Sequence, residues 1–109
     1  MIMKTLKFEE KLAKMVLSGE KNITWRFFDD KDLKEGDLVD FLVYETGNSF
    51  AKAKIINIKE KKLGELKPED FEGHEKFKDE NEMYETYRKY YGDIINSNSI
   101  IKIIKFKLI

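Results

Sequence analysis

Two apolar segments joined by a tight turn constrain the fold of this chain more than any other feature. Residues 38–44 form a strongly apolar run, and residues 50–59 alternate apolar side chains with lysines, as a half-buried strand does. Between them, Thr46-Gly47-Asn48 has the composition of a hairpin turn. The alternation loses its phase at Ile55-Ile56, which indicates a β-bulge. Bulged, paired strands of this kind favour a curved, barrel-like sheet.

The rest of the chain divides into strands, a turn and one irregular segment. Further strands are expected at residues 1–8, 22–28 and 100–109. The last of these changes phase near Ile103-Ile104. A turn is expected at residues 33–37, and the charged residues 60–78, which contain the only proline, are predicted to be irregular.

Two segments have helical periodicity. The first ends at Gly19, a residue that adopts the left-handed C-terminal conformation without strain, and its apolar face consists of Phe8, Leu12, Met15 and Val16. The second opens with a capping-box pattern at Asp79 and Glu82. It is expected to run up to Gly92, with a face of Met83, Tyr84, Tyr87, Tyr90 and Tyr91. The order β-α-β-β-β-α-β, with mostly hairpin-like connections, predicts an α+β domain built around a small barrel.

Length and composition indicate a globular protein of one domain. The chain has 109 residues, of which 41% are apolar and 39% charged, so a single domain over residues 1–109 is expected. The lack of cysteine excludes disulfides, thiolate metal sites and a cysteine nucleophile. The N-terminal residues lack the apolar run of a signal peptide or membrane anchor, so a cytoplasmic location is expected. Abundant lysine, glutamate and isoleucine without glutamine suit a thermophile, although an AT-rich genome explains the same bias.

The net charge of zero conceals an uneven distribution. Residues 60–85 carry ten carboxylates against five lysines, a balance of −5. Residues 86–109 carry five basic residues against Asp93, a balance of +4, and residues 1–59 are close to neutral at +1. RNA binding would therefore depend on a local basic patch rather than on the field of the whole protein.

The stretch G-E-K-N-I-T-W-R, residues 19–26, places three reactive side chains where a helix gives way to a strand. A threonine hydroxyl such as that of Thr24 is a weak nucleophile until a neighbouring base takes its proton. Lys21 can act as that base only if burial or nearby positive charge lowers its pKa. Arg26 shares a strand face with Thr24 and can supply that charge or bind a substrate oxygen. Strict alternation places Lys21 opposite Thr24, so Lys21 is expected to reach the site from the loop.

The spacing G-x-K-x-x-x-x-R, formed by Gly19, Lys21 and Arg26, resembles the signature of the ASCH domain, a family similar to the PUA domain. The turn L-K-E-G-D at residues 33–37, the Y-Y-G that ends the second helix and the order of elements agree with that family. The resemblance covers nearly the whole chain. It implies a PUA-like small mixed β-barrel with helices packed at its side, and a cleft that binds RNA or a nucleotide-like ligand.

Within this family, a bacterial branch that hydrolyses N4-acetylcytidine is similar through the longer motif G-x-K-x-I-T-x-R. Asn22 departs from it, because that branch tends to carry threonine there. The resemblance implies that Lys21, Thr24 and a glutamate before the last helix are catalytic, with the glutamate as general acid. That segment offers four glutamates, Glu69, Glu72, Glu75 and Glu80. The H-E-K-F sequence at residues 74–77 favours Glu75.

Plainer interpretations stand beside these roles. Lys21 alone would be a solvated lysine, and Thr24 an ordinary strand residue. Trp25 and the tyrosines of the second helix are expected to pack mainly in the core. Tyr87, Tyr90 and Tyr91 are candidates to edge the binding pocket with a hydroxyl, and Tyr90 is chosen as the binding residue. His74 is expected at the surface. The lysines of the last strand are interpreted as a solvated face, with phosphate contact as the alternative: Lys102, Lys105 and Lys107.

Three functions from different classes follow. The first is binding of RNA or a nucleotide-like ligand in a cleft lined by Lys21, Thr24, Arg26 and Glu75. The second is an amidohydrolase that deacylates a modified pyrimidine nucleoside such as N4-acetylcytidine. The third is a non-catalytic interaction module. No cofactor, metal or membrane partner is expected, because one histidine among scattered carboxylates makes no metal site.

Overall fold

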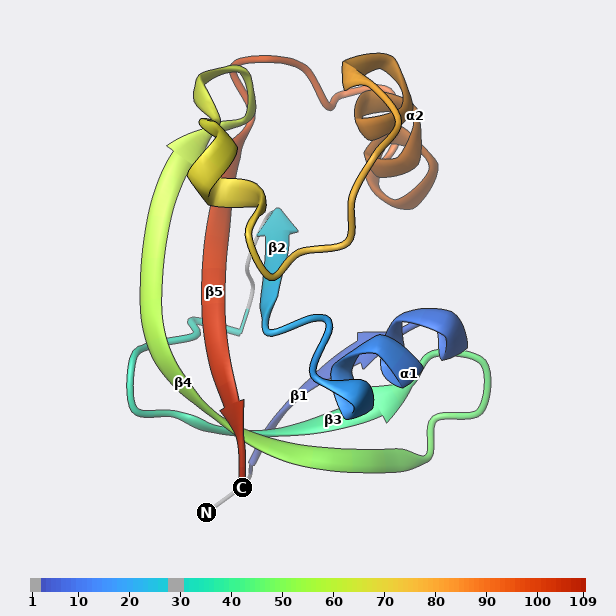
Figure 1. Ribbon diagram of the computed structural model, residues 1–109, viewed down its shortest axis with the longest axis vertical. Coiled ribbons are helices and arrows are strands. Elements are labelled where there is room, and N and C mark those ends of the chain that lie inside the picture. The colour runs from blue at the N-terminus through green and yellow to red at the C-terminus, as the bar shows by residue number, and fades with distance from the viewer. Residues whose placement is uncertain (1–2, 28–30) are drawn as a thin grey trace.

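The computed structural model describes residues 3–27 and 31–109 and has the predicted order of helices and strands (Figure 1). Two short 3-10 helices at Leu63–Glu65 and Pro68–Phe71 precede the second α-helix. The strands are β1 (Lys4–Phe8), β2 (Ile23–Phe27), β3 (Leu38–Val43), β4 (Ser49–Lys62) and β5 (Ile100–Leu108), and the helices are α1 (Glu10–Ser18) and α2 (Glu80–Tyr91). Residues 1–2 and 28, which belong to predicted strands, lie outside the described residues.

The strands form one mixed sheet that curves into a half-barrel. Its order is β1-β3-β4-β5-β2, with β1 parallel to β3 and the other pairs antiparallel. The pairing of β4 with β5 shifts register between Ile55 and Asn57, which confirms the bulge predicted there. β1 and β2 are the two edges of the sheet. The fold is therefore α+β and barrel-like, as the sequence predicts.

The structure changes two predicted boundaries. β4 continues to Lys62, because its last residues pair with the beginning of β5, and only residues after it leave the sheet. Phe8 belongs to β1 rather than to the first helical face. Its ring packs 4.7 Å from that of Phe41 in the core, since the chain turns into α1 only at Glu10.

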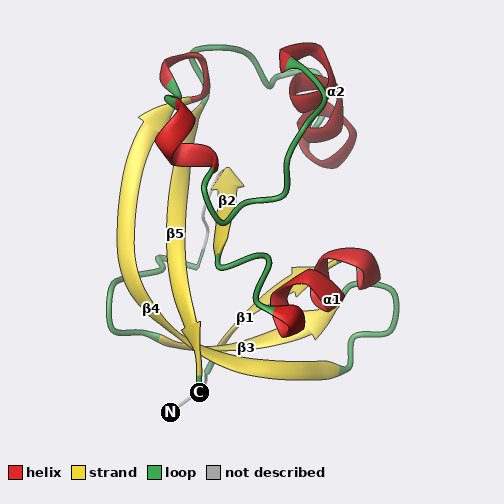
Figure 2. Cartoon of the chain, viewed as in Figure 1, coloured by secondary structure: helices red, strands yellow, loops and turns green. Residues whose placement is uncertain are grey.

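Each helix covers its own apolar cluster, and the two helices lie at opposite ends of the molecule (Figure 2). One cluster joins α1 to β1 and β3, and the other joins α2 to β2. β5 serves both clusters, because Ile104 belongs to the first and Ile103 to the second. This explains the phase change in β5: consecutive side chains point to opposite faces, and both faces are buried. Over residues 3–27 and 31–109, no helix is long and apolar enough to cross a membrane.

Candidate functional site

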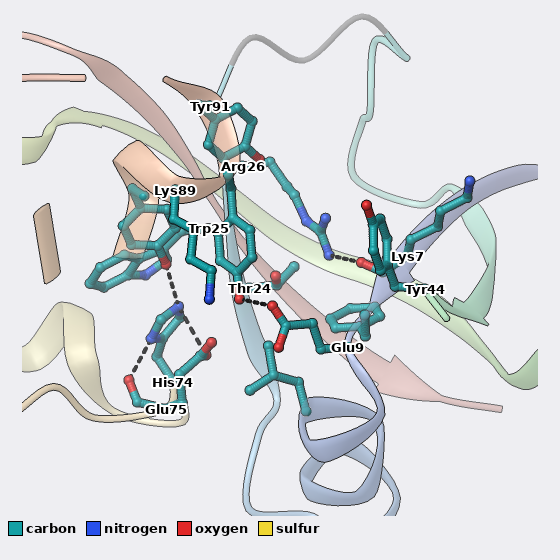
Figure 3. Close-up of a pocket in the computed structure, with 14 residues that line it drawn as sticks. Lys7, Glu9, Thr24, Trp25, Arg26, Tyr44, His74, Glu75, Lys89 and Tyr91 are labelled. Carbon is teal, nitrogen blue, oxygen red and sulfur yellow. Dashed lines mark hydrogen bonds and ion pairs between the residues drawn. The ribbon is translucent and has the colours of Figure 1, made fainter. Parts of the chain in front are cut away.

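A pocket of about 470 Å³ opens between the edge strands β1 and β2 and the last turns of α2 (Figure 3). Its size suits a small-molecule ligand. Figure 3 shows His74 and Glu75 on one side of the pocket, Lys7 and Tyr44 on the other, and Thr24 between them. The lining residues are Lys7, Phe8, Glu9, Leu12, Thr24, Trp25, Arg26, Tyr44, His74, Glu75, Tyr87, Lys89, Tyr90 and Tyr91.

Lys21 is buried in the loop between α1 and β2, with a residue exposure of only 2%. Gly19 ends α1 with a φ of 87°, and the Lys21 backbone N–H donates to the Met15 carbonyl at 3.1 Å, which turns the lysine inward. Its ammonium donates to the Ile23 carbonyl at 2.8 Å and forms an ion pair with Glu75. Burial lowers the pKa of Lys21 to about 8, although the Glu75 carboxylate opposes this. The loop origin predicted from the strand alternation is confirmed.

Glu75 reaches Lys21 because the loop that carries Glu75 is hydrogen-bonded to the start of β2. The Gly73 carbonyl accepts from the backbone N–H groups of Asn22 at 2.8 Å and Ile23 at 3.0 Å. Burial alone would raise the pKa of Glu75, but the neighbouring Lys21 ammonium holds it below its ordinary value. Of the four glutamates considered, this one contacts Lys21, whereas the other three are exposed: Glu69, Glu72 and Glu80.

Thr24 lies on β2 with only 4% of its surface exposed, and it lines the pocket. The Lys21 ammonium is anchored at the Ile23 carbonyl, which belongs to the peptide group that precedes Thr24. Lys21 and Thr24 are both described, and the structure records no hydrogen bond between the Thr24 hydroxyl and Lys21 Nζ. Lys21 therefore contacts Glu75 directly. Of the four residues expected to line the cleft, Thr24, Arg26 and Glu75 do so, whereas Lys21 lies behind Glu75 and is not part of the lining.

Arg26 connects the two edges of the half-barrel. Its guanidinium lies 4.8 Å over the Phe8 ring and donates to the Lys7 carbonyl at 3.0 Å. Two buried donors next to the pocket, Arg26 Nε and Trp25 Nε1, have no hydrogen-bond partner among the described residues. Buried donors are normally satisfied, so a ligand acceptor or a water is expected at these positions.

His74 is buried, with 4% exposure, and its predicted surface position is wrong. The imidazole stacks on Trp25, with 3.9 Å between ring centroids, because the bonded loop presses it against the second apolar cluster. Its Nδ1 lies 2.7 Å from the Glu75 carbonyl oxygen. Its Nε2 lies 3.2 Å from the Tyr87 hydroxyl and 3.1 Å from Glu75 Oε1. The one sequence feature that could have linked His74 to the site is its position next to Glu75.

Tyr90 crosses the pocket from α2 and donates a hydrogen bond to Glu9, the residue before α1. Burial and this bond raise the pKa of Tyr90 above its ordinary value. The other tyrosines of the stripe mainly pack, as predicted: the rings of Tyr87 and Tyr91 lie 5.0 and 5.1 Å from that of Phe27.

A second ion pair with a buried carboxylate joins Lys61 to Asp70 at 2.8 Å. In the described part of the chain, no three His, Asp or Glu side chains are grouped so as to hold a metal ion. Lys105 and Lys107 are exposed, as expected for a solvated strand face, whereas Lys102 is partly buried and donates to the Leu33 carbonyl at 3.3 Å.

Burial of His74 leads to a prediction about acid stability. Burial and the Lys21 ammonium lower the pKa of His74 from 6.5 to about 4, so below pH 6.5 the unfolded chain binds a proton that the folded chain does not. Stability is then lost as the pH falls from about 6.5 towards about 4, by up to ~1.4 kcal/mol per pH unit from this group. Urea unfolding across this window measures the slope, and His74→Gln should flatten it. Equal slopes for the two proteins would contradict the prediction.

No protein-family model matches the chain, and no curated protein matches it. Solved structures, however, share its fold at low sequence identity. A protein from Enterococcus faecalis V583 described by the family model DUF984 has a TM-score of 0.83 at 12% identity, over 100% of this chain and 77% of that one. The ASCH domain from Lactobacillus crispatus JV V101 has a TM-score of 0.71 at 13% identity, over 96% and 79%.

A third structure, of a protein from Pyrococcus furiosus, has a TM-score of 0.69 at 18% identity, over 99% of this chain and 98% of that one. These similarities extend over nearly all of the chain. The chain therefore has the ASCH-domain fold, which confirms the fold expected from the G-x-K-x-x-x-x-R spacing.

Proposed function

We propose that the pocket binds a modified pyrimidine nucleoside and hydrolyses its acyl amide bond, as in N4-acetylcytidine. The observation that carries this proposal is the buried ion pair of Lys21 with Glu75, a residue that lines a pocket of nucleoside size together with Thr24. Buried groups with shifted pKa values next to a pocket are typical of active sites.

In the proposed reaction, Lys21 acts as its neutral amine and takes the proton of the Thr24 hydroxyl. The threonine oxygen attacks the acyl carbon, and the tetrahedral intermediate collapses as the C–N bond breaks. Glu75 donates a proton to the leaving amine. A water molecule then hydrolyses the acyl-threonine ester, which releases the carboxylic acid and restores the hydroxyl. Arg26 binds an oxygen of the substrate in this scheme, which its unpaired buried Nε–H supports.

A second candidate function is binding of a nucleotide within RNA without turnover. The observation that favours it is the pair of exposed lysines at the pocket rim, Lys7 and Lys89, which suit a phosphate group. The neutral charge of the whole chain gives no further support to this alternative. Binding of this kind weakens steeply as salt rises, because phosphate contacts release counterions.

The test of the proposed function is release of cytidine from N4-acetylcytidine by the purified protein. The change is Lys21→Met, which keeps the length of the side chain but removes the base, and turnover should fall by about 10²-fold or more. Circular dichroism shows whether the variant is folded. Absence of cytidine release from the folded parent protein contradicts the hydrolase, and salt-dependent retention of RNA would then support the second candidate.

A further inference from the structure

His74 contacts Glu75, the carboxylate that pairs with Lys21. Its Nδ1 is 2.7 Å from a backbone carbonyl oxygen, that of Glu75, which can only accept a hydrogen bond. Nδ1 therefore carries a proton. The groups that face the ring from the surrounding elements are Lys21, Arg26, Tyr87 and Glu75, and burial among two of these cations keeps the imidazole neutral. A neutral ring protonated at Nδ1 has a bare lone pair at Nε2.

That lone pair faces an oxygen that is ordinarily an acceptor as well. Nε2 lies 3.1 Å from Glu75 Oε1, the same oxygen that pairs with Lys21. Two acceptors at hydrogen-bond distance repel each other unless a proton lies between them. The Tyr87 hydroxyl also lies 3.2 Å from Nε2 and competes with Glu75 for this single lone pair. Protonation of Glu75 turns the contact into an O–H···N hydrogen bond.

We propose that His74 positions the proton of the site by accepting a hydrogen bond from the carboxylic acid form of Glu75. The proton comes from Lys21: it moves from Nζ to the Glu75 carboxylate and leaves a neutral amine and a neutral acid. The net charge of the pair is zero before and after the transfer. The inference rests on the proposed hydrolysis, because the transferred form is the one that hydrolysis needs, with Lys21 as base and Glu75 as acid.

The alternative is that His74 only fills space against Trp25. Two substitutions separate these roles. Both remove the ring and its stacking, so a difference between them reports the hydrogen bond to Glu75 rather than packing. His74→Asn keeps an N–H donor near the position of Nδ1 but has no acceptor at the position of Nε2. His74→Gln extends its side-chain oxygen towards the position of Nε2 and can accept from Glu75 there.

The first test needs no substrate. His74 is the sole histidine, so its ring nitrogen signals in NMR are unambiguous. The neutral form protonated at Nδ1 is expected at neutral pH. The transferred form is a minor one at rest, because the Lys21 ammonium holds the pKa of Glu75 low, so the carboxyl carbon of Glu75 should shift slightly towards the acid form in the parent and in His74→Gln but not in His74→Asn. A ring protonated at Nε2 or on both nitrogens, or the same Glu75 shift in both variants, overturns the proposal.

The second test is the pH profile of N4-acetylcytidine turnover. His74→Asn should lose about 10-fold or more in kcat below the Lys21 pKa of about 8 and recover in part above it, where Lys21 loses its proton without help. His74→Gln should stay closer to the parent protein. Equal losses with unchanged profiles would assign His74 to packing alone. If the parent protein releases no cytidine, the proposed function fails, and the NMR result still decides where the proton lies.

Discussion

Replacement of Glu75 by methionine is expected to destabilise the folded chain by roughly 3 kcal/mol, because it leaves the buried Lys21 ammonium without its counter-charge. This is the low end of the range for breaking a buried pair, since 21% of the Glu75 side chain remains exposed. Lys21 must then lose its proton or be buried as a lone charge, so the loss should shrink as the pH rises. Urea unfolding at neutral and alkaline pH measures both effects.

A surface ion pair provides the matched control. Lys4 and Asp37 lie 2.9 Å apart, but their side chains are 34% and 27% exposed. Lys4→Met should therefore cost no more than ~1 kcal/mol. The double variant with methionine at both 21 and 75 should recover most of the stability lost in Glu75→Met, because no charge is left buried. A double variant as unstable as Glu75→Met would show that the loss comes from packing rather than charge.

Replacement of Thr24 by valine is expected to remove turnover of N4-acetylcytidine by about 10³-fold or more, because valine keeps the shape of threonine without its nucleophile. The stability of the variant should stay close to that of the parent, since the change leaves no buried polar group unpaired. Cytidine release and urea unfolding, measured on the same sample, separate the two effects.

Thr24→Ser is the companion variant, because it retains a hydroxyl at the same position. It should keep a measurable part of the activity, whereas Thr24→Val should not. Activity in Thr24→Val comparable to that of the parent would exclude the hydroxyl as nucleophile. Water activated by the pair of Lys21 and Glu75 would then have to attack the acyl carbon directly.

The sequence predicted most of the fold because its strands and helices have clear periodicities. The bulge at Ile55-Ile56 and the phase change at Ile103-Ile104 were both visible as breaks in alternation, and both correspond to real features of the sheet. The end of β4 was not visible, because residues 60–62 carry charged side chains. Their strand conformation comes from pairing with β5, a long-range contact that local composition does not encode.

The site was predicted less completely, for a different reason. Motif spacing pointed to Lys21, Thr24 and Arg26, which lie close together in the chain. The burial of His74 depends on how a loop with no periodicity of its own docks on Trp25, and its polar neighbours suggested a surface position. The one feature of the sequence that connects His74 with the site is its position next to Glu75.

The hydrogen bonds from the backbone of Asn22 and Ile23 to the Gly73 carbonyl determine when the site forms during folding. A side chain at residue 73 would place its Cβ 1.9 Å from Asn22 Oδ1, and the φ of 80° also favours glycine, so this residue permits a close crossing of two chain segments. Lys21 and Glu75 are 54 residues apart, and no local segment contains both. A partly folded chain therefore lacks the ion pair, and the site forms only when the loop is closed across the completed sheet.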